Sequence, residues 1–198
     1  MSSGVTTVAL FGGSFNPPHV GHVLAAAYVL SVGLVERVLV VPVFEHAFGK
    51  RLEPFEHRLQ MARRAFDWLP QVEVSSLEER LGVPSRTLRT VQVLEAEHPE
   101  WRLRLLVGSD ITGEIQKWYA FDEIQRRAPP LILTRAGAGA ALPGEGQGPA
   151  LLPVVSSTRI RQLLESAAAG GPGGAELGAL VPRAVLDYIA AHQLYRTP

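Results

Sequence analysis

A chain of 198 residues with 46% hydrophobic and 19% charged side chains can bury the core of one full-sized α/β domain, and its composition excludes wholesale disorder. Nineteen basic residues balance nineteen acidic ones, which argues against a nucleic-acid partner, where a basic surface is expected. The absence of cysteine excludes disulfides, thiolate metal ligands and cysteine nucleophiles. There is no signal-peptide pattern and no apolar run of the roughly 20 residues that cross a bilayer, so we expect a cytoplasmic protein without a membrane partner.

Short apolar runs typical of buried strands alternate with helical patterns along the chain. Strands are predicted at 8–11, 37–42, 72–74, 102–107 and 131–134, and helices at 20–34, 54–66, 85–97, 120–127, from 156 onward and at 182–194. This alternation predicts an α/β fold with a doubly wound, mostly parallel sheet. We expect one domain over 1–198, with a small helical C-terminal portion from about 156 to 198. Stretches rich in glycine, alanine and proline at 136–149 and 167–174 predict mobile loops.

Ligands of such sheets bind beyond the carboxyl ends of the strands. Just there, after the first predicted strand, the chain reads Phe-Gly-Gly-Ser-Phe-Asn-Pro-Pro-His-Val-Gly-His over 11–22. Gly12 and Gly13 allow backbone amides to approach a ligand closely. His19 and His22 share one side of a helix start, whose N–H groups and dipole suit phosphate. A metal site is the less favoured reading, because no third ligand is close in the sequence.

A second motif, Ser-Ser-Thr-Arg-Ile-Arg over 156–161, opens a helix near the other end of the chain. Hydroxyl groups at a helix start usually cap it. Arginines there oppose the helix dipole, which calls for another reason. Phosphate is such a reason, because hydroxyls, backbone amides and a guanidinium can grip it together.

With these two motifs the chain resembles the HxGH nucleotidylyltransferase superfamily, and its GGSFNPPHVGH segment resembles the nicotinate/nicotinamide mononucleotide adenylyltransferases within it. The neighbouring phosphopantetheine adenylyltransferases usually carry threonine in place of His19. The resemblance implies a Rossmann-like fold of the nucleotidylyltransferase type and an ATP site. For that site it implies His19 and His22, the backbone of Gly12, Gly13, Ser14 and Phe15, and Ser157, Thr158 and Arg161, with Arg159 less firmly placed.

The same resemblance implies further site residues in the middle of the chain. For ATP these are Gly108 and Asp110 at the end of the third strong strand, and Arg135. For the pyridine nucleotide they are Asn16, His46, Lys50, Thr87 and Trp118, the tryptophan stacking on the pyridine ring. His19, His22, Lys50 and Arg161 are the predicted catalytic residues. His57 and Arg58 are predicted to serve structure.

The segment 80–90 departs from the family pattern RxGPSYTxDT, because Arg86 and Arg89 replace a tyrosine and an aspartate. Thr87 and Thr90 still match it. We hypothesise that the added positive charge favours the carboxylate of nicotinate mononucleotide over the amide of nicotinamide mononucleotide. The alternative is that both arginines face solvent.

The implied reaction joins ATP to a pyridine mononucleotide and releases pyrophosphate, a step of NAD biosynthesis. The acceptor's phosphate is already ionised, so alignment and charge stabilisation suffice and no protein nucleophile is needed. We expect Mg²⁺ held by the substrate phosphates, and no metal site built by the protein. Three alternatives stay open: transfer to phosphopantetheine or another small phosphate ester, a nucleotide-binding sensor without turnover, and an RNA-binding domain. The oligomeric state is also open, a homo-oligomer included.

Overall fold

The computed structural model describes residues 4–45, 52–109, 115, 117–134, 152–168, 171 and 173–196. Five strands form one sheet in the order β3-β2-β1-β4-β5, and every neighbouring pair is parallel. This confirms the predicted parallel sheet, and all five predicted strands are present. The strands are β1 (Thr6–Gly13), β2 (Arg37–Pro42), β3 (Val72–Val74), β4 (Trp101–Gly108) and β5 (Pro130–Leu133).

Helices cover both faces of the sheet, because neighbouring residues of a strand face opposite sides. In β1, Ala9 and Phe11 join one core cluster with α1 and α2, whereas Val8 and Leu10 join a second with α3, α4 and α6. This doubly wound arrangement matches the prediction. The described helices are α1 (Val20–Ser31), α2 (Phe55–Phe66), α3 (Leu77–Leu81), α4 (Thr87–Glu97), α6 (Phe121–Arg127), α7 (Ser157–Ala168), α8 (Gly174–Leu180) and α9 (Arg183–Ala191).

Three details differ from the sequence prediction. Helix α1 ends at Ser31 rather than at 34, because Gly33 adopts a φ of 72° that interrupts the helix. Helices α3 and α8 were not predicted, since five and seven residues carry too little periodicity to stand out. The loop predicted at 167–174 is shorter in the structure, because α7 continues to Ala168 and α8 begins at Gly174.

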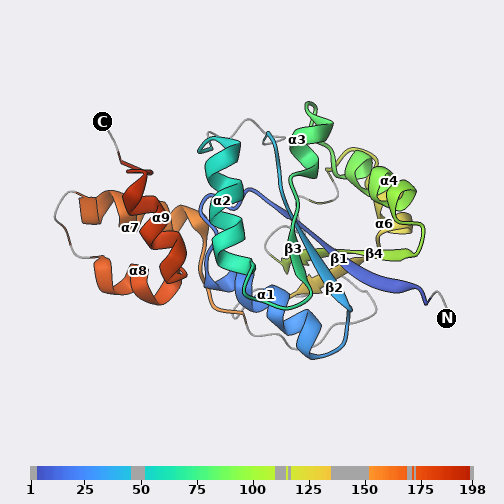
Figure 1. Cartoon of the computed structure of the whole chain (residues 1–198), viewed down its shortest axis with the longest axis horizontal. Coiled ribbons are helices and arrows are strands. Elements are labelled where there is room, and N and C mark those ends of the chain that lie inside the picture. The colour runs from blue at the N-terminus through green and yellow to red at the C-terminus, as the bar shows by residue number, and fades with distance from the viewer. Residues whose placement is uncertain are drawn as a thin grey trace.

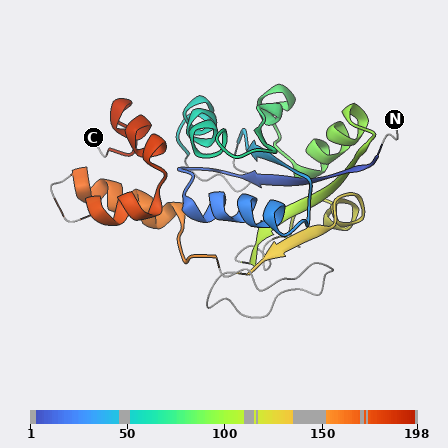
Figure 2. The ribbon, with the colours of Figure 1, turned by 60° about the horizontal axis from the view of Figure 1, so that its bottom comes forward.

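The three C-terminal helices lie together beyond the carboxyl end of β1, at the opposite end of the molecule from the N-terminus (Figures 1 and 2). Leu163, Leu177 and Val185 belong to the same core cluster as α1 and α2, so these helices extend that core. Helix α9 packs on α2, where Nδ1 of His57 lies 2.9 Å from the hydroxyl of Tyr188. The predicted structural role of His57 is confirmed by this contact.

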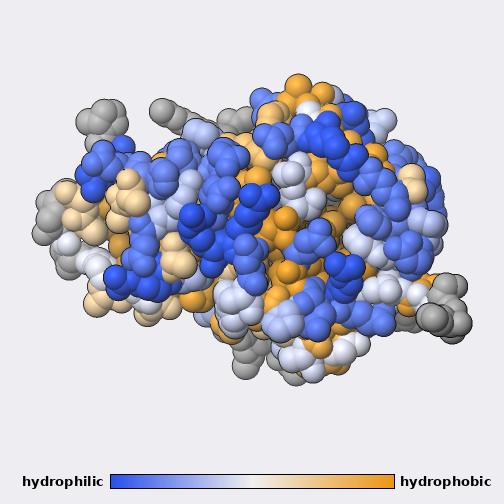
Figure 3. All heavy atoms as spheres, in the orientation of Figure 1, coloured by the Kyte–Doolittle hydropathy of each residue, from blue (hydrophilic) through white to orange (hydrophobic). Residues whose placement is uncertain are grey.

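The surface over α2 and α4 is hydrophilic, and hydrophobic atoms gather between these two helices on the face shown in Figure 3. Within the described ranges, no helix is long and apolar enough to pass through a membrane.

Candidate active site

Two cavities meet at the carboxyl end of β1. The larger, of about 600 Å³, lies on the side of α3 and α4, and the smaller, of about 160 Å³, lies on the side of α1. Gly12, Gly13, Leu106 and Val107 line both, and at the two glycines only backbone separates the cavities. The residues at the ends of β2 and β4 complete the arrangement, as the strand-end rule predicts. Two ligands could therefore approach each other across this pair of glycines.

The loop after β1 is fixed by its own aromatic residue. Phe15 has a φ of 46° and its ring is buried, with ring centroids 5.6 Å from Phe11, 5.9 Å from Phe66 and 5.0 Å from His22. Since the ring faces the core, only the backbone of Phe15 can face a ligand. That is the part of the residue assigned to the ATP site.

The two motif histidines lie at the start of α1. His19 is its N-cap residue, and the His19 backbone N–H donates to Nδ1 of His22 at 3.1 Å. The two rings are stacked, with centroids 3.7 Å apart. Because Nδ1 of His22 accepts this hydrogen bond, the proton of a neutral His22 ring is on Nε2. His19 is buried, whereas His22 is half-buried and lines the smaller cavity.

The glycine between these histidines is required by packing. A Cβ on Gly21 would lie 2.9 Å from Cγ1 of Val155 and 3.1 Å from Nδ1 of His19. Both distances are tighter than ordinary van der Waals contact. Gly21 thus lets the segment before α7 approach the histidines, and it brings the two sequence motifs together.

The second motif contacts the first directly. The hydroxyl of Ser157 donates to the carbonyl oxygen of Pro17 at 2.9 Å, and Nη1 of Arg161 donates to the carbonyl oxygen of Asn16 at 2.8 Å. The other Arg161 nitrogen, Nη2, donates to Oγ1 of Thr158 at 3.1 Å. Segments 140 residues and more apart in the sequence therefore form one surface.

The remaining residues of this motif serve helix α7. The hydroxyl of Ser156 accepts from the backbone N–H of Arg159 at 3.2 Å, which confirms the predicted cap. Arg159 forms an exposed ion pair with Glu176 of α8 at 3.2 Å. The ion pair supplies a structural reason for this arginine at the start of a helix.

Arg58 is a buried cation that joins the loops around the site. Its guanidinium donates to the carbonyl oxygens of Ser14, Val43, Phe44 and Glu53 at 2.8–3.0 Å. Burial lowers the pKa of Arg58 to about 10, so the group stays charged at neutral pH. The predicted structural role is confirmed, and it extends to the two loops that follow β1 and β2.

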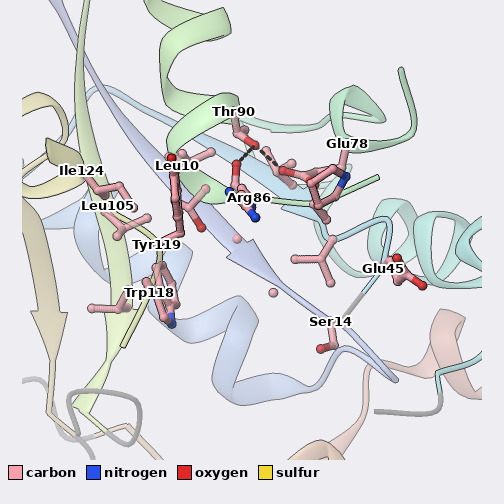
Figure 4. Close-up of a pocket in the computed structure, with 18 of the residues that line it drawn as sticks. Leu10, Ser14, Glu45, Glu78, Arg86, Thr90, Leu105, Trp118, Tyr119 and Ile124 are labelled. Carbon is pink, nitrogen blue, oxygen red and sulfur yellow. Dashed lines mark hydrogen bonds between the residues drawn. The ribbon is translucent and has the colours of Figure 1, made fainter. Parts of the chain in front are cut away.

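The larger cavity has aromatic residues on one side and polar residues on the other (Figure 4). Trp118 and Tyr119 follow β4, and Thr87 begins α4. The Arg86 guanidinium lies 4.1 Å from the ring centroid of Tyr119, a cation–π contact at the cavity. Both arginines are exposed, and of the two only Arg86 lines this cavity.

Sequence reasoning missed Glu78, a buried carboxylate that lines the same cavity. It accepts hydrogen bonds from the hydroxyls of Ser85 and Thr90, which ties α3 to the start of α4. Tyr119 and Lys117 were also missed as lining residues. A carboxylate in a short, unpredicted helix gives no periodic signal, so nothing local pointed to Glu78.

The structure brings together most of the predicted residues that it describes. Gly108 lines the smaller cavity, and Ser14, Thr87 and Trp118 line the larger. Asn16 is buried, and its Oδ1 accepts hydrogen bonds from Tyr195 and from the backbone of Glu53. The predictions for His46, Lys50, Asp110 and Arg135, and the loop at 136–149, lie outside the described residues.

No group of three or more histidine, aspartate or glutamate side chains that could hold a metal ion occurs among the described residues.

Comparison with known proteins identifies this α/β chain as a nucleotidyltransferase. The model of the cytidylyltransferase-like family matches residues 10–163, and the chain belongs to this family. Two relatives named probable nicotinate-nucleotide adenylyltransferase are similar over nearly their whole length. The protein of Anaeromyxobacter dehalogenans (strain 2CP-C) is 43% identical over 98% of this chain and 99% of its own, and that of Myxococcus xanthus (strain DK1622) is 40% identical over 96% and 97%.

A solved structure shares the fold. Nicotinic acid mononucleotide adenylyltransferase of Plasmodium falciparum, complexed with NaAD, superposes with a TM-score of 0.78 and 18% identity, covering 96% of this chain and 97% of its own.

Proposed function

We propose that this chain is a nicotinate-nucleotide adenylyltransferase, which transfers AMP from ATP to nicotinate mononucleotide in NAD biosynthesis and releases pyrophosphate. The observation that carries the proposal is the pair of cavities that share Gly12 and Gly13, with both phosphate-binding motifs beside them. One cavity suits each substrate, and the shared backbone lets their phosphates meet. The names of relatives about 40% identical over nearly the full chain support the same reaction.

In this mechanism the acceptor's phosphate attacks the α-phosphorus of ATP, and the bond to pyrophosphate breaks. The smaller cavity, lined by His22 and Gly108, would take ATP, and the larger cavity, lined by Trp118 and Thr87, would take the mononucleotide. The dipole of α1 and the Nε2–H of His22 would stabilise charge on the phosphates. Ser157, Thr158 and Arg161 would hold the β- and γ-phosphates.

The chain's contribution is alignment more than chemistry. Asn16, Lys50 and His46 would contact the acceptor, and Asp110 and Arg135 the adenosine part of ATP, as the family resemblance implies. Mg²⁺ bound to the triphosphate would neutralise charge that develops on the leaving pyrophosphate.

The preference for nicotinate over nicotinamide mononucleotide is the finer part of the proposal. Arg86 lines the acceptor cavity beside Tyr119, and Arg89 does not line it. A guanidinium near the pyridine ring would attract a carboxylate more strongly than an amide. Arg86→Ala should therefore lower kcat/KM for nicotinate mononucleotide about 3- to 10-fold relative to the amide substrate. Arg89→Ala is the matched control, and an unchanged ratio in Arg86→Ala would contradict this assignment.

Pyrophosphate release tests the proposed function as a whole. The protein is incubated with ATP and Mg²⁺, in parallel with nicotinate mononucleotide, nicotinamide mononucleotide and phosphopantetheine. Faster turnover with nicotinate mononucleotide is expected. Turnover with phosphopantetheine alone would move the chain to the neighbouring activity, and ATP binding without turnover would favour a sensor.

A further inference from the structure

The residue that connects the C-terminal segment to the site is Tyr195. It follows α9, has a φ of 60°, and is buried, with only 9% of its surface exposed. Its hydroxyl donates to Oδ1 of Asn16 at 2.8 Å, across 179 positions of the sequence. The hydroxyl also lies 3.9 Å from Sδ of Met61. A buried polar contact at this spacing fixes the position of both partners.

The second contact of Asn16 settles the orientation of its amide. The backbone N–H of Glu53 donates to the same Oδ1 at 3.2 Å. A backbone N–H can only donate, so the atom that it faces must be the oxygen and not the amide nitrogen. A flip of the amide would break the bonds from Glu53 and Tyr195 together. Nδ2 is thus held as the donor that points away from both.

The tyrosine is suited to this task at any physiological pH. Burial raises the pKa of Tyr195 well above its ordinary value of 10, and the nearby Glu53 carboxylate raises it further. The phenol therefore stays protonated and continues to donate. Tyr195 is also held from the other side, because its backbone N–H donates to Oε1 of Glu53 at 3.4 Å.

Asn16 in turn connects Tyr195 to the phosphate-binding motif. The Asn16 carbonyl oxygen accepts from Nη1 of Arg161 at 2.8 Å, and the next residue, Pro17, accepts from Ser157. A displacement of Asn16 would move its Nδ2, the donor available to the pyridine nucleotide. It would also move the carbonyl oxygen that holds Arg161, a predicted phosphate ligand.

We propose that Tyr195 is a positioning residue for the transfer reaction, which holds Asn16 so that its amide donor and the guanidinium of Arg161 are aligned for catalysis. The inference rests on the proposed function for the identity of the substrates. This role makes the segment after α9 part of the active site. The residue touches neither substrate and acts through Asn16.

The test compares Tyr195→Phe with Tyr188→Phe. Both replace a buried tyrosine of the C-terminal part, and each loses one hydrogen bond, to Asn16 and to His57 respectively. Tyr195→Phe should lower kcat about tenfold, the scale for a misaligned catalytic group, and raise the KM for the acceptor, which Asn16 would contact, together with the KM for ATP, which Arg161 would hold. Tyr188→Phe should keep kcat within about twofold of wild type. Its unfolding midpoint should fall by about as much as that of Tyr195→Phe. Equal kcat values in the two variants would overturn the proposal.

A double-mutant cycle separates positioning from general loosening. In an Asn16→Ala background, Tyr195→Phe should have no further effect on kcat, because the group that it positions is gone. An undiminished effect would overturn the proposal.

Wild-type turnover tests the proposed function independently. If no acceptor were turned over, the affinity for ATP of the same variants, measured by calorimetry, would still decide the inference. A loss of affinity confined to Tyr195→Phe supports it, and unchanged affinity in that variant counts against it.

Discussion

Arg58 offers the sharpest test of how the site is held together. Arg58→Ala removes four hydrogen bonds to carbonyl oxygens in the segments that follow β1 and β2. Its ring contact with Phe55, 5.5 Å from the guanidinium to the ring centroid, is lost as well. We expect both stability and activity to fall, because these segments carry Ser14 and Val43, which line the larger cavity.

The magnitude follows from two opposing contributions. Burial lowers the pKa of Arg58 to about 10, which corresponds to a cost of about 3 kcal/mol for burying the charge. Hydrogen bonds to a charged group contribute about 1.5–3 kcal/mol each, so the four together exceed that cost. The alanine variant leaves those carbonyl oxygens without their donor. Water that enters the vacated space would donate hydrogen bonds to some of them. We therefore expect a loss of about 3–5 kcal/mol in the free energy of unfolding.

Urea denaturation of Arg58→Ala, compared with wild type, measures this loss. Arg63→Ala changes the same residue type on the same helix, outside this network, and should cost less than about 1 kcal/mol. Arg58→Lys keeps the charge but cannot reach the same carbonyl oxygens with its single ammonium group, so it should recover only part of the stability. The reasoning would be refuted if Arg58→Ala lost less than about 1 kcal/mol, or no more than Arg63→Ala.

Three further predictions follow from other contacts. Gly21→Ala should lower the free energy of unfolding by about 1–3 kcal/mol in thermal unfolding, because its Cβ would meet Val155. Adding Val155→Ala to this variant should restore part of that loss, and no restoration would place the strain elsewhere. Above pH 10 the unfolded chain ionises at Tyr195 whereas the folded chain does not, so the stability that this group contributes is full below pH 10 and falls above it. The difference in unfolding free energy between wild type and Tyr195→Phe should therefore shrink by up to about 1.4 kcal/mol per pH unit above pH 10, and a constant difference would contradict the raised pKa. Trp118→Ala should raise the KM for the mononucleotide about tenfold in steady-state assays and leave the KM for ATP nearly unchanged, because Trp118 lines only the larger cavity. An equal rise in both KM values would show that the two substrates do not bind in separate cavities.

The local pattern of the sequence determined the sheet and the two motifs. Alternation of short apolar runs with helical patterns predicted a parallel, doubly wound fold, since periodicity reports which side of an element is buried. The glycines and histidines of 11–22 and the hydroxyls and arginines of 156–161 stood out for the same reason: their chemistry lies within a few neighbouring residues. The cap by Ser156 was predicted in this way and is confirmed, and so is the structural role of Arg58, which was predicted alongside the family resemblance.

Only the tertiary structure decided which distant residues share the site. Arg161 meets Asn16 across 145 positions, and Tyr195 meets the same residue across 179. Glu78 lies in a helix too short to show periodicity, yet it is buried in the wall of the larger cavity. Arg86 and Arg89 carry the same charge and are both exposed, and only the fold shows that Arg86, at the start of α4, lines the larger cavity whereas Arg89 does not. Such contacts depend on how elements pack in space, and the spacing of residues along the chain carries no record of that packing.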